Sequence, residues 1–465
     1  MGLDSTSENS VVFGYDDIMA PMKDKLVRGV RKALPRGAVQ LLESGYRKSR
    51  VHLVSARYGY PARDLKVVAV TGTNGKTTVA NYVNEIFKAA GFTTAMFSTA
   101  VIEVKGERRI NDLNATVATT AQMQRFFREA RKADVDYVVL EVTSHALDQY
   151  KLTTVPIECA IMTNLTQDHL DYHKTMEQYA AAKSKLFANQ PRFIVLNADD
   201  EWFETFNKFE AGEHKISYGT SDTADCRIQQ VKLYRKGSEA RVVFDHQTKL
   251  DLATSLPGKY NVYNMTAAAC AAYLMYVKLD AIQNGIANLE GVPGRFEYVD
   301  IDKPYEVIVD YAHTPDALEK LLEAVRGVTK NRVLLVFGAC GDRDQSKRPI
   351  MGRIAAEHAD RIFLTDEESY NEDPQVIRDM LRTGIEEAGG TPKLEEIADR
   401  REAIAKAMKV ARAGDVVLIT GMGHEQFRIV QGKKLPWNDG EVVKELAAST
   451  TKVTNKNEEG QPTPE

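Results

Sequence analysis

The segment KVVAVTGTNGKTTVANYVNEIFKAAG at residues 66–91 is the most informative about the fold, because an apolar run, a loop with two glycines and a helical run follow one another directly. Val67 to Val70 are typical of a strand buried inside a parallel sheet. The residues after Thr78 repeat apolar side chains at helical spacing. A loop at a helix N-terminus turns backbone N–H groups and the positive end of the helix dipole toward an anion. The stretch therefore predicts an α/β fold with a phosphate-binding loop.

The loop offers a set of groups that suits a nucleotide polyphosphate: Gly72, Thr73, Asn74, Gly75, Lys76, Thr77 and Thr78. Lys76 is placed to reach the terminal phosphates, and the Thr77 hydroxyl is placed to bind a magnesium ion. The spacing departs from GxxxxGK[ST], since Val70 occupies the first glycine position and Gly72 comes two residues later. A chance Gly-Lys-Thr turn is the alternative, and the strand–loop–helix context disfavours it.

Short apolar runs alternate with longer helical stretches from Lys66 onward, which is the pattern of parallel sheets with crossover helices. One set of runs lies at 137–142, 159–165 and 193–198, and a second set lies at 307–312, 333–339, 362–365 and 416–420. We expect two sheets. The seam between them is expected near GVPGR, Gly291 to Arg295, where glycine and proline cluster.

Polar side chains stand at the ends of the two runs that follow the loop. Glu141, Thr143, Ser144 and His145 close the run at 137–142, and Thr163, Asn164, Asp168 and His169 close the run at 159–165. Ligands of open parallel sheets bind beyond the carboxyl ends of the strands. A carboxylate and an imidazole at that edge would hold a magnesium ion that bridges phosphates and substrate. A purely structural role for the histidines is the alternative.

The composition narrows the class of function. A net charge of -4 with 27% charged residues gives no global field that would draw the chain to nucleic acid, which favours small-molecule substrates. The first residues do not resemble a secretory signal, and no segment reaches membrane-spanning length. The absence of CxxC pairing argues against a zinc ribbon or a disulfide framework and favours a reducing, cytoplasmic setting; the four cysteines are Cys159, Cys226, Cys270 and Cys340.

Both ends of the chain differ from the middle. Between Lys23 and Lys66, twelve Lys or Arg residues face three acids. Helical spacing around 26–34 and 51–58 predicts short amphipathic helices broken near Pro35 and Gly37. This basic segment either packs on the main body with a solvated face, grips a polyphosphate, or contacts an anionic membrane surface. Residues 1–20 and the polar stretch 447–465 are expected to be disordered.

Further motifs stand in the order found in one family: EVTSHALDQYKL at 141–152, TNLTQDHLDYH at 163–173, YAAAK at 179–183, NVYNMTAA at 261–268, GRFE at 294–297, DYAHTPDAL at 310–318, GACGDRDQSKRPIMG at 338–352 and GMGHE at 421–425. Together with TGTNGKTT they resemble the Mur ligase family from about Lys66 to Leu446. Within that family the chain is most similar to the branch that adds an amino acid to UDP-N-acetylmuramoyl dipeptide in peptidoglycan precursor synthesis.

The resemblance implies a domain plan and a reaction. A short basic segment (1–65) precedes a central P-loop-type ATP-binding domain (66–294), a Rossmann-like carboxyl-terminal domain (295–446) that delivers the amino acid, and a disordered tail (447–465). A substrate carboxylate attacks the γ-phosphate of ATP, and an amine then displaces phosphate from the acyl phosphate. We expect a monomer that acts on small molecules without inserting into a membrane.

The resemblance also assigns roles to single residues. Lys76 would bind the γ-phosphate, Thr77 and Glu141 a first magnesium ion, and His169 a second. Lys183 matches the lysine that is carbamylated in this family, a change that turns an ammonium into an anion able to support magnesium. The nucleotide would also contact Asn261, Arg295 and Asp310. The muramoyl peptide would contact Thr119, Thr120, Ser144, His145 and Lys151. The acceptor of the amine's proton stays open between His145 and His313.

The sequence departs from the family at three places. Only about 65 residues precede the loop, so we expect the uridine-diphosphate-binding domain to be shortened or replaced, which leaves the carrier nucleotide open. Lys151 stands where the family usually has an arginine, so a point charge replaces a bidentate fork. Glu367, Glu368, Ser369 and Tyr370 stand where diaminopimelate-adding members have Asp-Asn-Pro-Arg.

The third departure bears on the amino acid, because the arginine that would grip the distal carboxylate of diaminopimelate is absent. We expect a lysine-like substrate, whose distal amine faces Glu425 and either Glu367 or Glu368, near Gly421, and whose α-carboxylate faces Arg343. An exposed acidic loop without ligand contact is the alternative.

Two rival functions remain. A folylpolyglutamate-synthetase-like ligase shares the loop and the domain plan, although DYAHTPDAL, KRPIMG and GMGHE favour the muramoyl branch. A nucleotide-dependent binding protein without catalysis is the other rival. The joint presence of Lys76, Glu141, His169 and Lys183 speaks against it.

Overall fold

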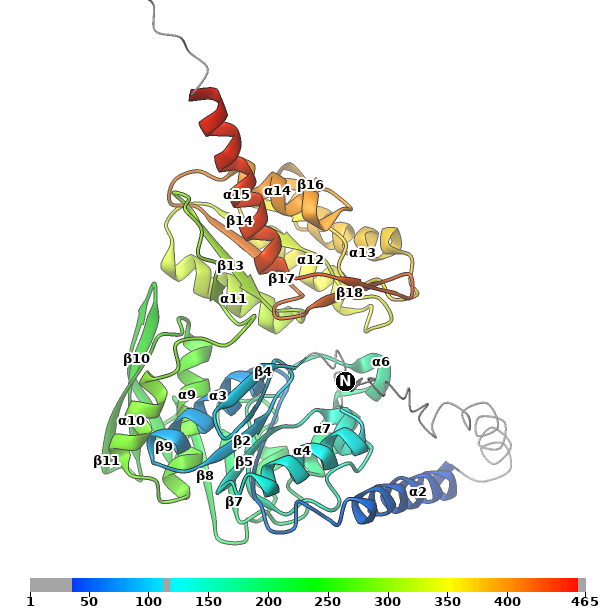
Figure 1. Cartoon of the computed structure of the whole chain (residues 1–465), viewed down its shortest axis with the longest axis vertical. Helices are drawn as coiled ribbons and strands as arrows, with labels where there is room; N and C mark the ends of the chain where they lie inside the picture. The colour runs from blue at the N-terminus through cyan, green and yellow to red at the C-terminus, as the bar shows by residue number, and fades with distance from the viewer. Residues whose placement is uncertain (1–35, 112–117, 459–465) are drawn as a thin grey trace, which may run out of the picture.

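Two sheets organise the chain, one of eleven strands and one of six, and helices cover both faces of each (Figure 1). The computed structural model describes residues 36–111 and 118–458. The expected α/β architecture is confirmed, and a two-stranded hairpin adds a small third sheet. Within the described residues, no helix is both long enough and apolar enough to cross a membrane.

The larger sheet has the order β11-β10-β9-β8-β7-β6-β1-β5-β2-β3-β4. β1 lies near its centre between the parallel strands β5 and β6, and β2, β7 and β8 continue the parallel pairing. Antiparallel strands extend both edges. The strands are β1 (Lys66–Thr71), β2 (Thr94–Phe97), β3 (Val101–Val104), β4 (Glu107–Ile110), β5 (Tyr137–Glu141), β6 (Ile157–Met162), β7 (Phe193–Asn197), β8 (His214–Gly219), β9 (Cys226–Tyr234), β10 (Gly237–Phe244) and β11 (Thr248–Thr254).

Successive side chains of β1 point to opposite faces of the sheet, and both faces are buried. Val68 and Val70 point into a core shared with α3, α9 and α10, whereas Val67 and Ala69 point into a core shared with α4, α5 and α7. The helices associated with this sheet are α3 (Lys76–Ala89), α4 (Thr120–Lys132), α5 (Ser144–Asp148), α6 (Leu170–His173), α7 (Met176–Ser184), α8 (Phe203–Asn207), α9 (Lys259–Leu274) and α10 (Leu279–Ala287).

The second sheet has the order β12-β13-β17-β14-β15-β16, and only its edge strand β12 is antiparallel. Helices α11, α12 and α13 cover one face, and α14 and α15 cover the other. The strands are β12 (Glu297–Tyr298), β13 (Glu306–Asp310), β14 (Val333–Phe337), β15 (Arg361–Leu364), β16 (Leu394–Glu396) and β17 (Val416–Thr420); the hairpin is β18 (Phe427–Val430) and β19 (Lys433–Pro436). The helices are α11 (Pro315–Val328), α12 (Lys347–His358), α13 (Pro374–Glu387), α14 (Arg400–Val410) and α15 (Asp439–Glu458), with a 3₁₀ turn at Thr391–Lys393.

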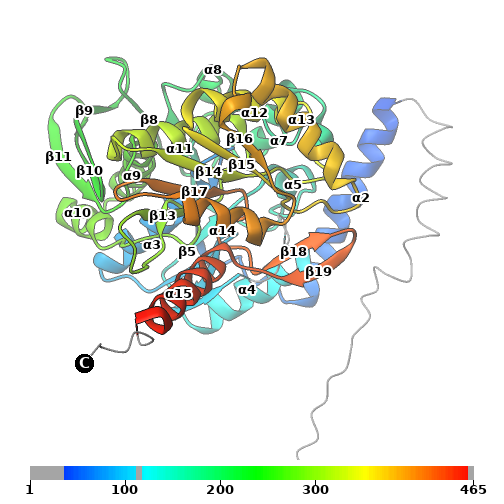
Figure 2. The same cartoon turned by 90° about the horizontal axis from the view of Figure 1, so that it is seen from above.

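The helix α2 (Arg36–Arg57) corrects the expectation for the basic segment. It runs through Gly37 without interruption, so the predicted break at that glycine is wrong. The predicted helical spacing around 26–34 and the predicted disorder at 1–20 lie outside the described residues. In Figures 1 and 2, α2 lies along one flank beside α4, and β9–β11 form the opposite flank.

The carboxyl-terminal helix α15 corrects the expected start of the tail. It continues past Ala447 to Glu458, and Ala447 is buried against the second sheet. The polar stretch 447–458 therefore continues a helix whose beginning is anchored by packing, and the predicted disorder of this stretch stays a prediction. Residues 459–465 lie outside the described residues.

Candidate active site

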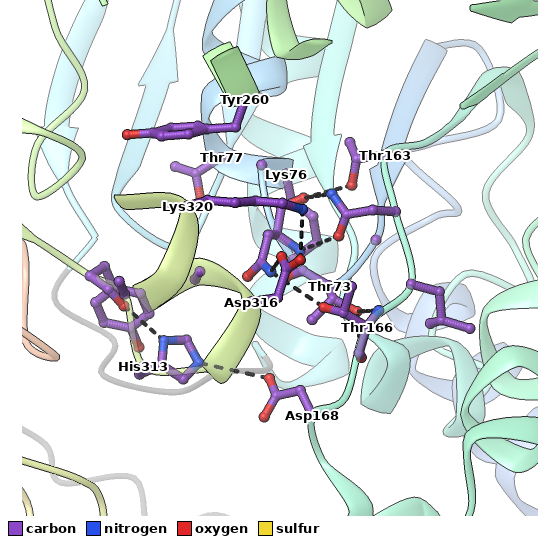
Figure 3. Close-up of a pocket in the computed structure, with 18 of the residues that line it drawn as sticks. Thr73, Lys76, Thr77, Thr163, Thr166, Asp168, Tyr260, His313, Asp316 and Lys320 are labelled. Carbon is purple, nitrogen blue, oxygen red and sulfur yellow. Dashed lines mark hydrogen bonds and ion pairs between the residues drawn. The ribbon is translucent and has the colours of Figure 1, made fainter. Parts of the chain in front are cut away.

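A cavity of about 1150 Å³ opens between the two sheets, and side chains from both sides line it. The first side contributes the loop at 72–78 and the ends of β5 and β6. The second side contributes the start of α11 and the loops that follow β14, β15 and β17. Figure 3 shows this meeting: Asp316 and Lys320 on α11 lie beside Lys76 and Thr73 of the loop. Residues more than two hundred positions apart thus share one site.

The two glycines of the loop are required by close packing. A Cβ on Gly72 would lie 1.8 Å from Thr163 Oγ1, and a Cβ on Gly75 would lie 2.3 Å from Asn264 Oδ1. Gly75 also has φ 84° and precedes α3 as an N-cap without a side-chain hydrogen bond. The first N–H groups of α3 are therefore not covered by a capping side chain, which suits an anion at this helix end.

Residues after the end of β6 hold the phosphate loop by hydrogen bonds. Asn164 Oδ1 accepts a hydrogen bond from Asn74 N at 2.9 Å, and Thr163 Oγ1 donates to Asn74 O at 2.7 Å. Both side chains belong to the polar set that the sequence placed at this strand end. They serve to hold the phosphate loop in shape.

Lys76 and Thr77 occupy the positions expected of a phosphate site. Lys76 Nζ donates to Thr73 O at 2.7 Å, and burial lowers the pKa of Lys76 while Glu141 opposes that change. Thr77 Oγ1 donates to Glu141 Oε2 at 2.9 Å, and Thr99 N donates to the same oxygen at 2.9 Å. A hydroxyl and a carboxylate converge here, and both are oxygen ligands of the kind that magnesium prefers.

The donor set fits magnesium held mainly by a nucleotide. Among residues 36–111 and 118–458, no group of three or more His, Cys, Asp or Glu side chains is arranged to hold a metal ion. Magnesium that accompanies nucleotide phosphates usually takes one or two carboxylates from the protein and fills its other positions with phosphate oxygens and water. Glu141, with the Thr77 hydroxyl beside it, meets that requirement.

Asp168 and His169 form a second polar cluster at the end of β6. His169 Nε2 lies 3.2 Å from Asp168 Oδ2, and burial lowers the pKa of His169 to about 3, so its imidazole is neutral. Lys347 from the second side places Nζ 3.4 Å from Asp168 Oδ1, and His313 Nε2 lies 3.8 Å from Oδ2. Burial alone would raise the pKa of Asp168, but Lys347 and then His169 and His313 hold it well below its ordinary value.

Lys183 is enclosed on α7 with its amine directed at the loop. The residue is 1% exposed, and Nζ donates to Gly72 O at 2.7 Å and lies 4.6 Å from the ring centre of Tyr179. Burial lowers the pKa of Lys183 well below its ordinary value, and the nearby charge of Lys76 adds to that effect. A buried lysine of this kind holds its amine in the neutral, nucleophilic form.

The residues predicted to contact the nucleotide are also gathered around the loop. Arg295 donates to Thr77 Oγ1 at 3.2 Å, and its guanidinium lies 4.6 Å from the ring centre of Tyr311. Asp310 accepts from Phe296 N and Ala312 N, both at 2.7 Å, so its carboxylate fixes the turn that carries Arg295. Asn261 donates to Pro257 O at 2.7 Å at the start of α9.

The far end of the cavity is acidic. Glu367 is 2% exposed; its Oε1 accepts from Cys340 Sγ at 2.8 Å, and its Oε2 is buried without a hydrogen-bond partner. Glu368 Oε2 accepts from the Tyr370 hydroxyl at 3.0 Å, and burial together with Glu367 raises its pKa. Burial and then Glu368 raise the pKa of Glu425 to about 7. Three carboxylates gathered at one end of a cavity, two of them with raised pKa values, indicate a place for a cation.

Glycine and arginine complete this acidic end. A Cβ on Gly421 would lie 2.1 Å from Glu367 Oε2, so glycine is needed here to leave room for that carboxylate. Arg343 lines the cavity, and its guanidinium lies 5.0 Å from the ring centre of Tyr370. The predicted amino-acid contacts therefore lie together at one end of the cavity, opposite the phosphate loop.

The residues expected to contact the muramoyl peptide are only partly at the cavity. Ser144 lines it and shares a hydrogen bond of 2.9 Å with His173. His145, which packs its ring 4.9 Å from that of His169, is not among the lining residues, and neither are Thr119 and Thr120 at the start of α4. Lys151 is buried and donates to Ala118 O at 2.7 Å. The predicted peptide contacts of these four residues stay predictions.

Several lining residues were not predicted from the sequence as site residues. Asp316 accepts from Asn74 Nδ2 at 2.8 Å and pairs with Lys320 at 2.6 Å, and Lys347 reaches Asp168 as described above. Asp316 and Lys347 lie inside the motifs DYAHTPDAL and KRPIMG, which were used only to recognise the family. Cys340 also belongs to such a motif. His313, one of the two proton acceptors considered, lines the cavity.

Comparison with known proteins agrees with this geometry. Residues 70–272 match the Mur ligase middle domain, and residues 294–423 match the Mur ligase, glutamate ligase domain. The chain is 38% identical over 422 residues to the UDP-N-acetylmuramoyl-L-alanyl-D-glutamate–2,6-diaminopimelate ligase of Syntrophomonas wolfei, covering 90% of this chain and 85% of that protein. It is 39% identical over 399 residues to the ligase of the same name from Bacillus velezensis, covering 84% of this chain and 80% of that protein.

Solved structures give the same result. A structure of a UDP-N-acetylmuramoyl-L-alanyl-D-glutamate–2,6-diaminopimelate ligase matches with a TM-score of 0.57 at 33% identity, covering 83% of this chain and 79% of that one. A Mycobacterium tuberculosis folylpolyglutamate synthase matches with a TM-score of 0.67 at 18% identity, covering 87% and 95%, which shows a shared fold. The resemblance found in the motifs is confirmed: the chain belongs to the Mur ligase family, whose members use ATP and magnesium to form amide bonds.

Proposed function

We propose that the chain joins the free carboxylate of UDP-N-acetylmuramoyl dipeptide to a diamino acid, with lysine as the preferred substrate. One observation carries the proposal: a single cavity has a phosphate loop at one end and three carboxylates with an arginine at the other. Activation of a carboxylate needs the first end, and capture of a cationic amino acid needs the second. The names of the relatives specify a muramoyl dipeptide and 2,6-diaminopimelate, so they support ligation of a diamino acid to that dipeptide, and the preference for lysine rests on the acidic end of the cavity.

The first step is phosphoryl transfer. A carboxylate oxygen of the dipeptide attacks the γ-phosphorus of ATP, the bond to the bridging oxygen of ADP breaks, and an acyl phosphate forms. Lys76 and the N–H groups at the start of α3 bind the γ-phosphate, and Arg295 approaches from the other side of the cavity. Thr77 and Glu141 would hold magnesium, which offsets charge on the phosphate oxygens when it is bound. Asn261 and Asp310 shape the nucleotide side.

Lys183 and His169 suit a second magnesium position. A neutral amine attacks carbon dioxide, loses one proton and becomes a carbamate, which is anionic. The depressed pKa of Lys183 favours that neutral amine, and its direct contact with the loop carbonyl of Gly72 supports a position of the carbamate beside the phosphate loop. The neutral imidazole of His169 is able to ligate the same ion. We therefore propose two magnesium ions and a carbamylated Lys183.

The second step is attack by the amine. The amine nitrogen adds to the acyl carbon, phosphate leaves, and the amine releases a proton to give the amide. Arg343 is placed to bind the α-carboxylate of the incoming amino acid by a bidentate contact. Glu367, Glu368 and Glu425 would bind the ammonium of its side chain, because that cation relieves their mutual repulsion.

The charges at the acidic end favour lysine over diaminopimelate. Among the lining residues, the arginines are Arg295, which faces Thr77, and Arg343. If Arg343 binds the α-carboxylate, the distal carboxylate of diaminopimelate would face the three glutamates without an arginine partner. The γ-carboxylate of an incoming glutamate would meet the same repulsion, which disfavours the folylpolyglutamate-type reaction.

Phosphate release tests the proposal. The enzyme is supplied with ATP, magnesium and UDP-N-acetylmuramoyl dipeptide, and kcat/KM is compared for L-lysine and meso-diaminopimelate, with Lys76→Ala as the inactive control. We expect a preference for lysine of about tenfold or more, since an unpaired carboxylate in a site built for a cation is strongly rejected. Equal or faster turnover with diaminopimelate would remove lysine from the assignment and leave the ligase reaction intact.

A charge-neutral variant locates the source of the preference. Glu367→Gln keeps the shape of the side chain and removes its charge, and Glu386→Gln makes the same change at an exposed position on α13. We expect the first variant to lose most of the lysine preference and the second to keep it. A full preference in Glu367→Gln would contradict the proposed contact.

A further inference from the structure

The helix α2 is fixed on the protein by its inner face. Val51 is 2% exposed, Ser55 Oγ lies 2.8 Å from Thr154 Oγ1, and Arg47 forms an ion pair of 3.0 Å with Asp148. Arg47 also donates to the backbone oxygen of Asp148 at 3.2 Å. These contacts set the rotation of the helix about its own axis, and so they determine which side chains face outward.

The outer face carries an apolar stripe. Leu42, Tyr46 and Leu53 are 55%, 56% and 73% exposed. Spacings of four and seven residues place all three on one line along the helix, on the side opposite Val51. An exposed leucine is common by itself. Here three large apolar side chains are exposed in line on a helix that is docked by its other face, which makes them a continuous apolar surface.

Positive charge borders the stripe along one edge. From residue 42 to residue 57 the helix has four Lys or Arg residues and one acid, although the whole chain has a net charge of -4. Arg50 and Arg57 are exposed and border the stripe along one edge, and Lys48 is exposed nearer to the protein body. The combination of apolar side chains with flanking cations is the pattern of a helix that lies on an anionic lipid surface.

The position of α2 leaves this face free of the active site. In Figures 1 and 2 the helix lies along an outer flank of the molecule, beside α4 and on the side opposite β9–β11. No residue of α2 that the structure describes lines the cavity between the two sheets. A surface that covered the stripe would therefore leave substrate access unchanged.

We propose that the outer face of α2 docks on the surface of a membrane rich in anionic lipid. The leucines and the tyrosine would enter the boundary between headgroups and acyl chains, and Arg50 and Arg57 would lie against lipid phosphates. A folded protein partner fits less well, because three side chains on a convex ridge offer far less than the roughly 800 Å² per partner of a stable interface. The proposal does not depend on which amino acid the enzyme adds.

Vesicle sedimentation tests the proposal with the full chain. The protein is mixed with vesicles of phosphatidylcholine alone and with vesicles that contain phosphatidylglycerol, at low and at high salt. We expect binding only to the second kind, and weaker binding at high salt because the cations are screened. Leu53→Glu should lower the bound fraction on the order of tenfold or more, since it replaces an inserted side chain with a charge that anionic lipid repels.

A matched variant separates docking from general surface charge. Tyr276→Glu places the same new charge at a side chain that is 68% exposed beyond the end of α9, and we expect it to bind vesicles like the unchanged protein. Phosphate release by both variants should equal that of the unchanged protein, which shows that they are folded. Equal binding to neutral vesicles, no binding by the unchanged protein, or equal losses in the two variants would overturn the proposal. A change from dimer to monomer in Leu53→Glu, measured by light scattering, would assign the stripe to a second copy instead.

Discussion

Lys183 joins two properties that rarely occur together in one side chain. It is almost fully buried, and its only direct hydrogen bond in the described structure goes to a carbonyl oxygen of the phosphate loop. An ammonium in such a place is poorly stabilised, whereas a carbamate would extend the amine toward the phosphates as an anion. The chemistry of this residue is therefore decided by its surroundings.

Lys183→Ala should lose activity and regain part of it with a small carboxylate. Removal of the amine should lower kcat on the order of a hundredfold or more, as expected when a group that supports a metal ion is lost. Formate or acetate added at millimolar concentration should restore part of kcat by occupying the vacated volume. Rates of phosphate release are the measurement, and Lys76→Ala is the control, since carboxylate should not rescue a lost phosphate ligand. Absence of rescue, or equal rescue of both variants, would argue against a carbamate.

Glu425 predicts a dependence of stability on pH. Burial and the neighbouring Glu368 raise its pKa from 4.5 to about 7, so between these values the folded state binds a proton that the unfolded state releases. The contribution of Glu425 to the free energy of unfolding is therefore largest below pH 4.5, and it falls as the pH rises to 7. Glu425→Gln should remove that fall, which amounts to about 1–3 kcal/mol.

Thermal unfolding at pH 5 and pH 8 without substrate checks the effect of Glu425. The unchanged protein should lose more stability than Glu425→Gln over this interval. Lysine added at pH 8 should stabilise the unchanged protein more than the variant, because binding to the folded state raises its stability. Identical changes in melting temperature for the two proteins would show that Glu425 does not titrate in this range.

At the scale of the element, β1, the loop and α3 form the unit that makes the phosphate site. Gly75 and Gly91 offer a controlled comparison, since their φ angles are 84° and 86°, but only Gly75 is crowded by Asn264. Gly91→Ala should cost about 1 kcal/mol of stability, from backbone strain alone, and should leave the KM for ATP unchanged. Gly75→Ala should in addition raise the KM for ATP about tenfold or more, because the loop must shift to relieve the contact.

Steady-state kinetics and unfolding curves of both variants separate the effect of backbone strain from the effect of the contact with Asn264. A KM for ATP that changes equally in Gly75→Ala and Gly91→Ala would mean that positive φ alone matters. A KM that is unchanged in both would mean that the loop tolerates a side chain beside Asn264.

Most of the parallel strands were predictable from sequence because burial on both faces makes them continuous apolar runs, whereas the parallel strands β2, β8 and β16 were not predicted. β5, β6, β7, β13, β14, β15 and β17 lie within three residues of the runs that indicated them at both ends. The antiparallel strands were not predicted. β4 and β19 are exposed along their whole length, and β9 is exposed toward its end, so no apolar pattern marks them. The bounds of α2 and α15 were not predicted, because glycine and a polar composition are weak helix signals; α2 includes Gly37, and α15 continues beyond the buried Ala447.

The parts of the site that lie within one short segment of the chain could be predicted from the sequence. The loop, Glu141 and His169 follow single strands, so a strand–loop pattern identifies them. Lys347 and Asp316 matter because the second sheet brings them against the first, and no sequence spacing expresses that contact. The acidic end had a local signal in Glu367 and Glu368. The unpaired oxygen of Glu367 and its contact with Cys340 appear only in three dimensions.

At the scale of the whole molecule, polar contacts join the two sides of the cavity. Arg295 meets Thr77, Asn74 meets Asp316, and His424 Nε2 donates to Thr99 O at 3.1 Å. Away from the cavity, Arg235 on the β9–β10 turn pairs with Glu306 at the start of β13. Interfaces within a chain that contain such polar contacts commonly permit relative motion of the two parts, although Tyr260 of α9 also packs against the core of the second part.

Lys347 is the contact that most directly links this motion to the chemistry. It is 4% exposed, belongs to the second side, and places Nζ 3.4 Å from Asp168 Oδ1 beside the proposed magnesium ligand His169. Lys347→Met keeps the length and removes the charge, which leaves the buried carboxylate of Asp168 with weaker partners and favours separation of the two sides. We expect kcat for amide formation to fall about ten- to a hundredfold, which corresponds to about 1.4–2.8 kcal/mol. Binding of a non-hydrolysable ATP analogue, which rests mainly on the loop, should change little.

A surface lysine supplies the control for Lys347. Lys406 is 42% exposed and pairs with Glu395 within the second part of the molecule. Because this ion pair is at the surface, Lys406→Met should leave kcat within about twofold. Small-angle scattering with the ATP analogue and muramoyl dipeptide should show a larger radius of gyration for Lys347→Met than for Lys406→Met. A normal kcat in Lys347→Met would contradict the link between the ion pair and closure. A reduced kcat with an unchanged radius would place Lys347 in the chemistry of the site and not in the approach of its two halves.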